Sequence, residues 1–188
     1  MITSILLGTS ILFLASAVRY ALTGSKLHKQ SALILTIAGS VYFLMSILYG
    51  TDTDTNLRVF RYADWFLTVP LMVNQMIGLS SHKGAYNLFY CVLTSILMLG
   101  CGFVGELEIL PKIFMGVIGT IFALFTFLPL FNQIDKRTNK IYYLIMVGWL
   151  FYPIVYFMPD TVNLILAYSI VDIVVKIGFA EYLHKKLV

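Results

Sequence analysis

The apolar stretch at residues 165–179 reads ILAYSIVDIVVKIGF, and two charged residues, Asp172 and Lys176, interrupt it. Such a stretch predicts a membrane-spanning helix, in which an unpaired ammonium group is costly. Residues four apart share a helix face, so the two side chains can pair, but pairing seldom recovers the whole cost of desolvation. A lysine at that depth therefore indicates that its side chain has a functional role. A desolvated lysine amine can condense with a carbonyl group to form a Schiff base.

The composition of the whole chain is that of a membrane protein. Hydrophobic residues make up 60% of the 188 residues and charged residues 12%, whereas a soluble domain has roughly 25% charged residues. The mean hydropathy is +0.89. No spacing of His, Cys, Asp or Glu predicts a metal site. The net charge of +4 is a property of the loops and gives no reason to expect a nucleic-acid partner. We do not expect an enzyme.

Seven stretches are long and apolar enough to cross a bilayer, which takes about 20 residues as a helix. They leave no room for a soluble domain. The first has no basic segment before it, so we interpret it as a retained helix and not as a cleaved signal. The prediction is an all-α membrane protein, a seven-transmembrane-helix bundle forming one domain over residues 1–188, multi-pass in the cell membrane. The stretches are residues 2–22, 31–49, 60–79, 86–104, 113–131, 141–158 and 161–183.

The loop charges predict the orientation of the chain. The first, third and fifth connections and the C-terminus carry most of the basic residues, whereas the other side carries Arg58 and Lys112 beside several acidic residues. Basic residues mark the cytoplasmic side of a membrane protein. We therefore expect the N-terminus outside and the C-terminus in the cytoplasm. The basic residues on the expected cytoplasmic side are Lys26, Lys29, Lys83, Lys136, Arg137, Lys140, Lys185 and Lys186.

The charged residues that remain inside the predicted spans are Arg61, Asp64, Asp172 and Lys176. Their formal charges sum to zero, and a low-dielectric interior tolerates charges best in a balanced group. Arg61 and Asp64 share one helix face, and Thr68 lies one turn further, where its hydroxyl can bond Asp64. We expect these residues to form one cluster. A structural charge pair in a small solute transporter is the alternative.

Four segments resemble those of the microbial (type 1) rhodopsins. Residues 59–71 read VFRYADWFLTVPL and are similar to the third helix of the proteorhodopsin-like group. Residues 172–179 read DIVVKIGF and resemble the helix that binds retinal. Residues 147–157, VGWLFYPIVYF, and 98–105, MLGCGFVG, resemble helices that enclose the chromophore. The resemblance implies a seven-helix bundle with covalently bound all-trans retinal.

The resemblance also implies a role for each polar residue of the cluster. Lys176 would carry retinal as a protonated Schiff base, with Asp64 as counterion and proton acceptor and Asp172 as second counterion. Arg61 would modulate both carboxylates from the outer side, and Thr68 would orient Asp64. Aromatic and small residues supply the walls that a polyene needs, although plain helix packing explains such residues as well. The implied retinal pocket consists of Trp65, Met72, Met98, Gly102, Gly116, Trp149, Tyr152, Pro153 and Tyr156.

One position departs from the proton pumps of this family, which carry a carboxylic acid eleven residues after the counterion. This chain has Gln75 there (64 + 11 = 75). An amide cannot donate a proton at neutral pH, so the motif Asp64–Thr68–Gln75 keeps the acceptor and loses the donor. We predict a light-driven outward proton pump. The second half of its photocycle, in which a proton returns to the Schiff base, is expected to be slow. A photosensory rhodopsin and a light-gated ion channel with a slow photocycle are the alternatives. Met72 is apolar at the position that the resemblance associates with spectral tuning, which implies green and not blue absorption.

The expected partners are the lipid bilayer and protons. The resemblance implies a homo-oligomer, either a trimer or a pentamer. A sensor would also need a separate transducer on the cytoplasmic side, where Lys136, Arg137 and Lys140 form a basic loop. Membrane topology explains these three residues equally well.

Overall fold

The computed structural model describes residues 1–23, 25–49, 54–79, 85–131, 139–158 and 162–187. Throughout these residues the regular structure is helical, with no strand, which confirms the all-α prediction. The elements are α1 (Ile2–Ala21), α2 (Lys26–Leu48), α3 (Asp54–Leu79), α4 (Ala85–Glu106), α5 (Lys112–Phe131), α6 (Asn139–Tyr156), α7 (Val162–Asp172), the π-helical segment η1 (Ile173–Ile177) and α8 (Gly178–Leu187).

Several of these helices have the length and apolarity of membrane spans. Within the described ranges, four are long and apolar enough to cross a membrane: Ile2–Ala21, Lys26–Leu48, Leu88–Glu106 and Lys112–Leu130. α7, η1 and α8 follow one another without interruption and together form the last predicted span. Some charges that predicted the orientation lie outside the described residues, namely Asp52, Lys83, Lys136, Arg137 and Asp160.

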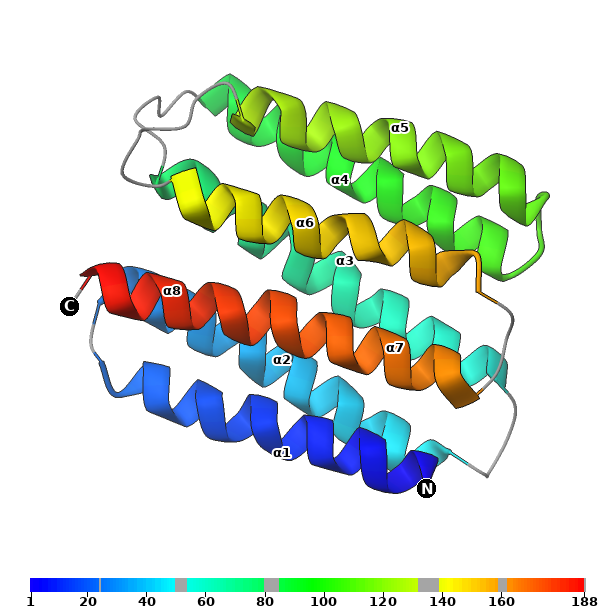
Figure 1. Ribbon diagram of the computed structural model, residues 1–188, viewed down its shortest axis with the longest axis horizontal. Coiled ribbons are helices and arrows are strands. Elements are labelled where there is room, and N and C mark those ends of the chain that lie inside the picture. Colours follow the sequence, from blue (N-terminus) through cyan, green and yellow to red (C-terminus); the bar gives the residue numbers. More distant parts are fainter. Residues whose placement is uncertain (24, 50–53, 80–84, 132–138, 159–161, 188) are drawn as a thin grey trace. The chain divides into compact units, whose positions relative to one another are not determined.

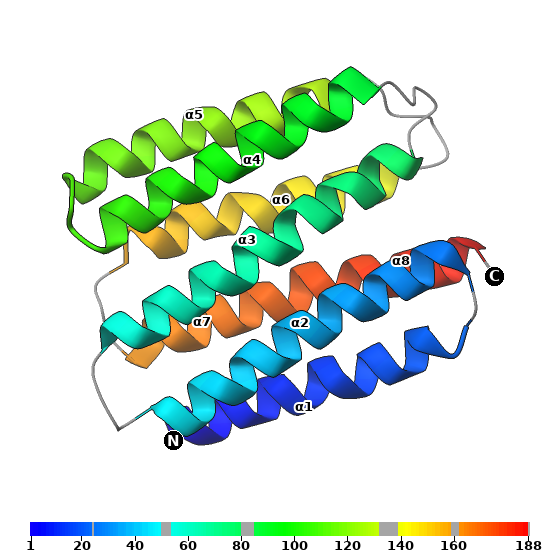
Figure 2. The same ribbon diagram turned by 180° about the vertical axis from the view of Figure 1, so that it is seen from behind.

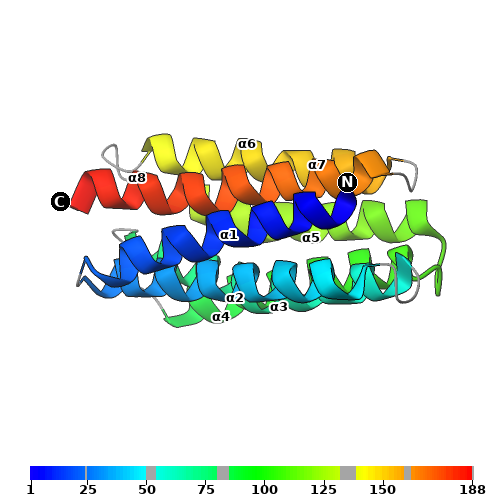
Figure 3. The ribbon, with the colours of Figure 1, turned by 90° about the horizontal axis from the view of Figure 1, so that it is seen from below.

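The chain divides into two compact units, and the first contains Met1–Thr68 and Met158–Val188. In this unit α1 and α2 run side by side as an antiparallel hairpin (Figure 1). α1 also packs along α7 and η1 (Figure 3). The start of α1 and the end of α8 lie at opposite ends of the unit (Figure 1), as expected for a chain that crosses a membrane an odd number of times.

A glycine sets the distance between α1 and α2. A Cβ atom at Gly39 would lie 2.7 Å from Cγ of Leu14, so only glycine fits without displacing that side chain. The Ser10 hydroxyl donates a hydrogen bond of 2.8 Å to the Gly39 carbonyl. Small residues permit such close packing of membrane helices. The close approach brings the rings of Phe13 and Tyr42 to a centroid distance of 5.5 Å in the buried core.

α3 contributes to both units. Pro70 lies inside this helix, where it removes one backbone hydrogen bond because proline has no N–H. Membrane helices tolerate the loss when neighbouring groups bond the exposed carbonyl. The N-terminal segment of the first unit ends at Thr68, just before this proline. The half of α3 with Arg61 and Asp64 therefore belongs to the first unit, and the half with Gln75 belongs to the second.

The second unit contains Val69–Phe157, which includes the rest of α3 and all of α4, α5 and α6. α4 and α5 form another antiparallel hairpin (Figure 2), and α6 packs on α5. The Thr126 hydroxyl on α5 donates a hydrogen bond of 2.9 Å to Thr94 Oγ1 on α4. A Cβ atom at Gly119 would lie 3.3 Å from the carbonyl oxygen of Met98. A polar contact and a small residue thus hold these two apolar helices close together.

Candidate functional site

Lys176 lies in η1, between α7 and α8. A π-helical turn inside an α-helix is rare and frequently marks a functional site. The Lys176 side chain is 1% exposed. Its Nζ atom lies 5.8 Å from the ring centroid of Phe13 on α1. The amine is therefore held in the interior of the first unit, against an aromatic face.

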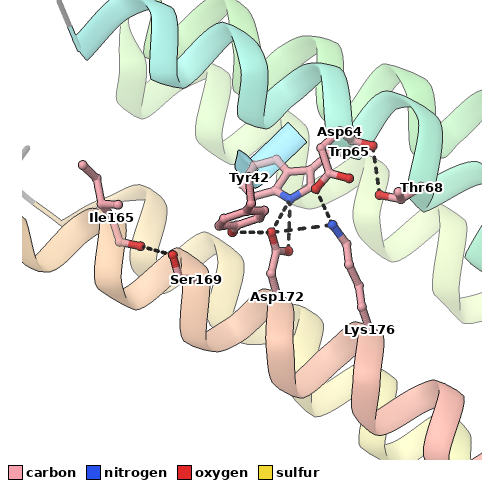
Figure 4. A network of polar contacts seen from close by, with 8 residues as sticks. All are labelled: Tyr42, Asp64, Trp65, Thr68, Ile165, Ser169, Asp172 and Lys176. Carbon is pink, nitrogen blue, oxygen red and sulfur yellow. Dashed lines mark hydrogen bonds and ion pairs between the residues drawn. The ribbon is translucent and has the colours of Figure 1, made fainter. Parts of the chain in front are cut away.

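Two carboxylates face this amine. Nζ of Lys176 donates a hydrogen bond to Oδ2 of Asp64 on α3, and it lies 3.6 Å from Oδ2 of Asp172, one turn earlier on its own helix. Both acidic side chains are fully buried (Figure 4). Single ions are costly in such surroundings, whereas a balanced and hydrogen-bonded group costs far less. The structure thus brings these three site residues together.

Asp172 receives hydrogen bonds from two other helices. The Tyr42 hydroxyl on α2 donates to Oδ2 at 2.8 Å, and the Trp65 indole Nε1 on α3 donates to Oδ1 at 3.1 Å. Both donors converge on this carboxylate in Figure 4. Hydrogen bonds to a charged acceptor are roughly twice as strong as those between neutral groups. Two donors from other helices therefore hold the Asp172 carboxylate in place, and Trp65 has a polar role besides its predicted place in a pocket.

Asp64 has a different set of contacts. The Thr68 hydroxyl donates to the backbone carbonyl of Asp64 at 2.9 Å, which places the two residues together. The second carboxylate oxygen of Asp64, Oδ1, is buried and has no hydrogen-bond partner among the described residues. A buried acceptor without a donor costs about 1–3 kcal/mol. Asp64 therefore offers an oxygen that can accept a proton.

Arg61 lies among aromatic rings of the first unit. Its guanidinium carbon is 4.0 Å from the ring centroid of Tyr168 and 5.5 Å from that of Trp65. The side chain is almost completely buried, and a desolvated cation over an aromatic face gains about 2 kcal/mol. Its charge lies one turn before Asp64 on α3. Together with Lys176 it balances the two buried carboxylates.

The remaining predicted pocket residues and Gln75 belong to the second unit. The Trp149 ring lies 4.8 Å from that of Phe127 and 5.8 Å from that of Tyr152, between centroids. The Trp149 indole nitrogen is buried and has no hydrogen-bond partner in the described part of the chain. Of the other residues, Met72 and Gln75 are buried on α3. Met98 and Gly102 are half-buried on α4, and Pro153 lies inside α6.

Gly116 and Tyr156 contact each other within this second unit. A Cβ atom at Gly116 would lie 2.7 Å from Cε1 of Tyr156, so the ring packs directly on the α5 backbone. The Tyr156 hydroxyl also donates to the carbonyl of Lys112 at 3.2 Å. The structure therefore gives Gly116 a role in close helix packing. Its place in a retinal pocket stays a prediction.

Three contacts of this site were not anticipated from the sequence. They are made by Phe13, Tyr42 and Tyr168. Tyr168 precedes Asp172 by four residues, and this spacing is a usable signal because it places both on one helix face. Tyr42 has no such signal, since 130 residues separate it from its partner.

The geometry is suited to holding a positive charge on one nitrogen and moving a proton from it. The Lys176 amine can form a Schiff base with an aldehyde, and a protonated Schiff base keeps the charge that the carboxylates balance. Asp64 lies within hydrogen-bond reach of that nitrogen, which is the geometric requirement for proton transfer. The residues described by the structure contain no group of three or more His, Cys, Asp or Glu side chains that could hold a metal ion.

Known proteins of one kind match this chain. Residues 1–187 match the family model described as "Bacteriorhodopsin-like protein". A blue-light absorbing proteorhodopsin from Gamma-proteobacterium Hot 75m4 is 33% identical over 175 residues, covering 79% of this chain and 68% of that protein. A green-light absorbing proteorhodopsin from Gamma-proteobacterium EBAC31A08 is 29% identical over 204 residues, covering 95% and 80%. Sensory rhodopsin-2 of Haloarcula vallismortis is 26% identical over 201 residues, covering 93% and 82%.

Solved structures agree with these relatives. The blue light-absorbing proteorhodopsin from Med12 has a TM-score of 0.81 and 25% identity, covering 96% of this chain and 94% of that chain. Acetabularia rhodopsin I has a TM-score of 0.83 at 20% identity, covering 95% and 90%, which is a likeness of fold. Both are seven-helix bundles, so the predicted fold class is confirmed.

Proposed function

The chain belongs to the bacteriorhodopsin-like family, and we propose that it is a light-driven outward proton pump with Asp64 as the proton acceptor. Like the rest of that family, it is a multi-pass membrane protein. One observation carries the proposal. The buried amine of Lys176 lies between a carboxylate with an oxygen that no described residue bonds and a carboxylate that two donors hold.

Retinal, joined through a Schiff base, is the chromophore of this family, and the residues of the first unit fit it. The Lys176 amine is fully buried, and the carboxylates beside it balance the charge of a protonated nitrogen. Bound there, retinal supplies the absorption of visible light and the isomerisation that changes the position of the nitrogen's proton relative to Asp64. The residues of the chain itself accept, release and deliver the proton in the rest of the cycle.

The first half of the cycle moves a proton from the Lys176 nitrogen to Asp64. The two groups are already in hydrogen-bond contact, so the transfer needs no large movement of either helix. Tyr42 and Trp65 already donate hydrogen bonds to Asp172, whereas one oxygen of Asp64 has no partner among the described residues, which favours Asp64 as the acceptor. Arg61 lies one turn nearer the N-terminal end of α3, which the loop charges place outside the cell. A proton released past Arg61 therefore leaves outward.

The second half returns a proton to the Lys176 nitrogen from the cytoplasm. Gln75 is buried at the position where related pumps carry an acid, and its amide has no proton to give at neutral pH. Another group must therefore supply the proton. Without a carboxylic donor, this half of the cycle is slow.

The test is to express the chain in cells supplied with retinal and to record the external pH under illumination. An outward pump acidifies the medium, and an uncoupler abolishes the change because protons then flow back. A Lys176→Arg variant is the control, since it keeps the charge but cannot form the Schiff base. Coloured cells whose medium does not acidify would contradict the proposal.

A photosensor is the second candidate, and Gln75 is the observation that favours it. A cycle without a carboxylic donor prolongs the deprotonated state, and a long-lived state suits signalling. Sensory rhodopsin-2 is also among the relatives that cover most of this chain. Colour with a slow photocycle and no acidification is the result expected of a sensor. A current that reverses with voltage would instead indicate a channel.

The pocket residues, the green absorption and the oligomer remain part of the proposal. Met72 is apolar and buried, and the relatives include both green- and blue-absorbing proteins. An absorption maximum in the blue would contradict the role given to Met72. The mass of the purified pigment in a lipid nanodisc tests the expected trimer or pentamer.

A further inference from the structure

The first unit contains a second polar cluster at the end that holds the C-terminal turn of α8. It combines Tyr20 of α1, His28 of α2 and His184 of α8, which include two of the three histidines of the chain. His184 follows Lys176 by eight residues, or about 12 Å along a helix. The loop charges place this end in the cytoplasm.

The three rings pack on one another. The His28 and His184 rings have centroids 5.2 Å apart in an edge-to-face arrangement. Tyr20 stacks on His28 with an angle of 4° between the planes, and it meets His184 edge-on at 5.9 Å. His28 is 1% exposed, whereas His184 is half-buried. One imidazole is thus enclosed, and its neighbour can reach solvent.

Hydrogen bonding in the cluster is incomplete. Ser25 Oγ lies 2.6 Å from His28 Nδ1 and accepts a bond from the His28 backbone N–H, which occupies one ring nitrogen. The other nitrogen, His28 Nε2, and Nδ1 of His184 are buried and have no partner among the described residues. Burying such a group without a partner is unfavourable. A proton shared between the two imidazoles, directly or through a water molecule, would satisfy both.

Charged residues of both signs lie on the three helices that carry the cluster. Arg19 of α1 and Glu181 of α8 form an ion pair at the edge of the cluster, and the Arg19 guanidinium carbon lies 5.7 Å from the ring centroid of Tyr20. Lys26 and Lys29 on α2 and Lys185 on α8 are exposed, and these basic charges oppose a second proton.

We propose that His28 and His184 share one proton and deliver it to the nitrogen of Lys176, in place of the acid that is missing at position 75. The inference rests on the proposed function for its use of the proton. His184 then recovers a proton from the cytoplasm through its exposed side. Buried Phe179 and Leu183 lie between Lys176 and His184 on α8, so the delivery is slow. A proton fits better than a metal ion because the described residues supply no third ligand of the usual kind.

The first measurement needs no light. Pigment labelled with ¹⁵N in its histidines is titrated in the dark from about pH 5 to about pH 9, around the ordinary histidine range. The ring signals of His28 and His184 are expected to move together with one midpoint and a total uptake of one proton. In a Ser25→Ala variant, which keeps both rings but removes the partner of His28 Nδ1, that common midpoint shifts. Two independent midpoints that are the same in the Ser25→Ala variant and in the unmodified protein would overturn the inference.

The second measurement is the decay of the deprotonated state after a flash. In the unmodified protein the rate levels off on the acid side of the common midpoint, because the donor is then fully loaded. In a His28→Gln/His184→Gln protein the rate keeps rising with proton concentration. Near neutral pH it is about 10²-fold slower, the lower end of what a positioned acid contributes. His82→Gln changes the chain's third histidine and should behave like the unmodified protein.

The outcomes separate this inference from the proposed function. A shared dark titration in a protein that does not acidify the medium would contradict the pump and support the histidine site. Normal pumping with the same pH–rate profile in the double variant would overturn the histidine site and leave the pump intact. If the double variant forms no pigment, His184→Gln alone serves, because that side chain is half-buried and its loss disturbs the core less.

Discussion

Asp64 and Asp172 both face the amine of Lys176, but their surroundings differ. Asp172 accepts hydrogen bonds from Tyr42 and Trp65, whereas one oxygen of Asp64 has no partner among the described residues. We propose that these two identical side chains therefore have different tasks: Asp172 keeps its charge, and Asp64 takes up the proton. Their environments, and not the residue type, would assign the two roles.

Replacing Lys176 has the largest expected effect, because it removes the group that both carboxylates serve. Lys176→Ala gives no pigment, and it also leaves two buried carboxylates without their cation, at a cost of about 3–5 kcal/mol. Lys176→Arg keeps the charge and likewise gives no pigment, which separates loss of the link from loss of folding. Absorption spectra of purified protein with added retinal check both. A coloured Lys176→Arg protein would contradict the assignment.

Neutralising each carboxylate in turn tests the comparison directly. Asp64→Asn removes the acceptor, so proton transport stops and absorption shifts to the red as the cation loses its nearest counterion. Asp172→Asn also shifts the colour but retains proton transfer from the Lys176 nitrogen, with a lower yield. Flash spectroscopy of the two variants checks this. Retained transfer in Asp64→Asn would reverse the two roles.

Gln75→Glu tests whether Asp64 is an acceptor without a matching donor. A carboxylic acid at this position should shorten the deprotonated state by about 10²-fold, the lower end of what a positioned acid contributes. Gln75→Met has similar length but no acidic proton, and it should not accelerate the decay. Equal decay rates in all three proteins would show that delivery past position 75 does not limit the cycle.

Tyr42→Phe should have the smallest effect of the four, because Trp65 still bonds Asp172. A hydrogen bond to a charged group contributes about 1.5–3 kcal/mol, and its loss makes the two carboxylates more alike. The expected result is a modest shift of the absorption maximum and a lower yield of proton transfer to Asp64. Tyr49→Phe, at the residue that directly follows α2, is the matched control. Identical behaviour of the two variants would mean that Tyr42 does not distinguish the carboxylates.

The sequence predicted most of what local spacing determines. Asp172 and Lys176 are four residues apart, and Arg61, Asp64 and Thr68 follow one helix face, so their shared positions could be derived from helix geometry. Charge balance then predicted that the two helices meet. The helical fold class followed from seven long apolar stretches in the same way.

Contacts between distant segments were not predictable in this way. Tyr42 and Asp172 are 130 residues apart, and nothing local in either segment indicates the partner. The π-helical turn at Lys176 was not predicted either, since such turns are rare and the local sequence Ile173–Ile177 gives no signal for one. Trp65 was assigned to a pocket because aromatic rings suit a polyene, but its indole N–H also needs an acceptor when buried, and that acceptor is Asp172.

Infrared difference spectroscopy of the illuminated pigment tests the division of roles between the two carboxylates most directly. When the nitrogen of Lys176 loses its proton, a carbonyl band of a protonated carboxylic acid should appear. The band should be absent in Asp64→Asn and present in Asp172→Asn. A band that survives in Asp64→Asn and disappears in Asp172→Asn would contradict the assignment of Asp64 as the acceptor.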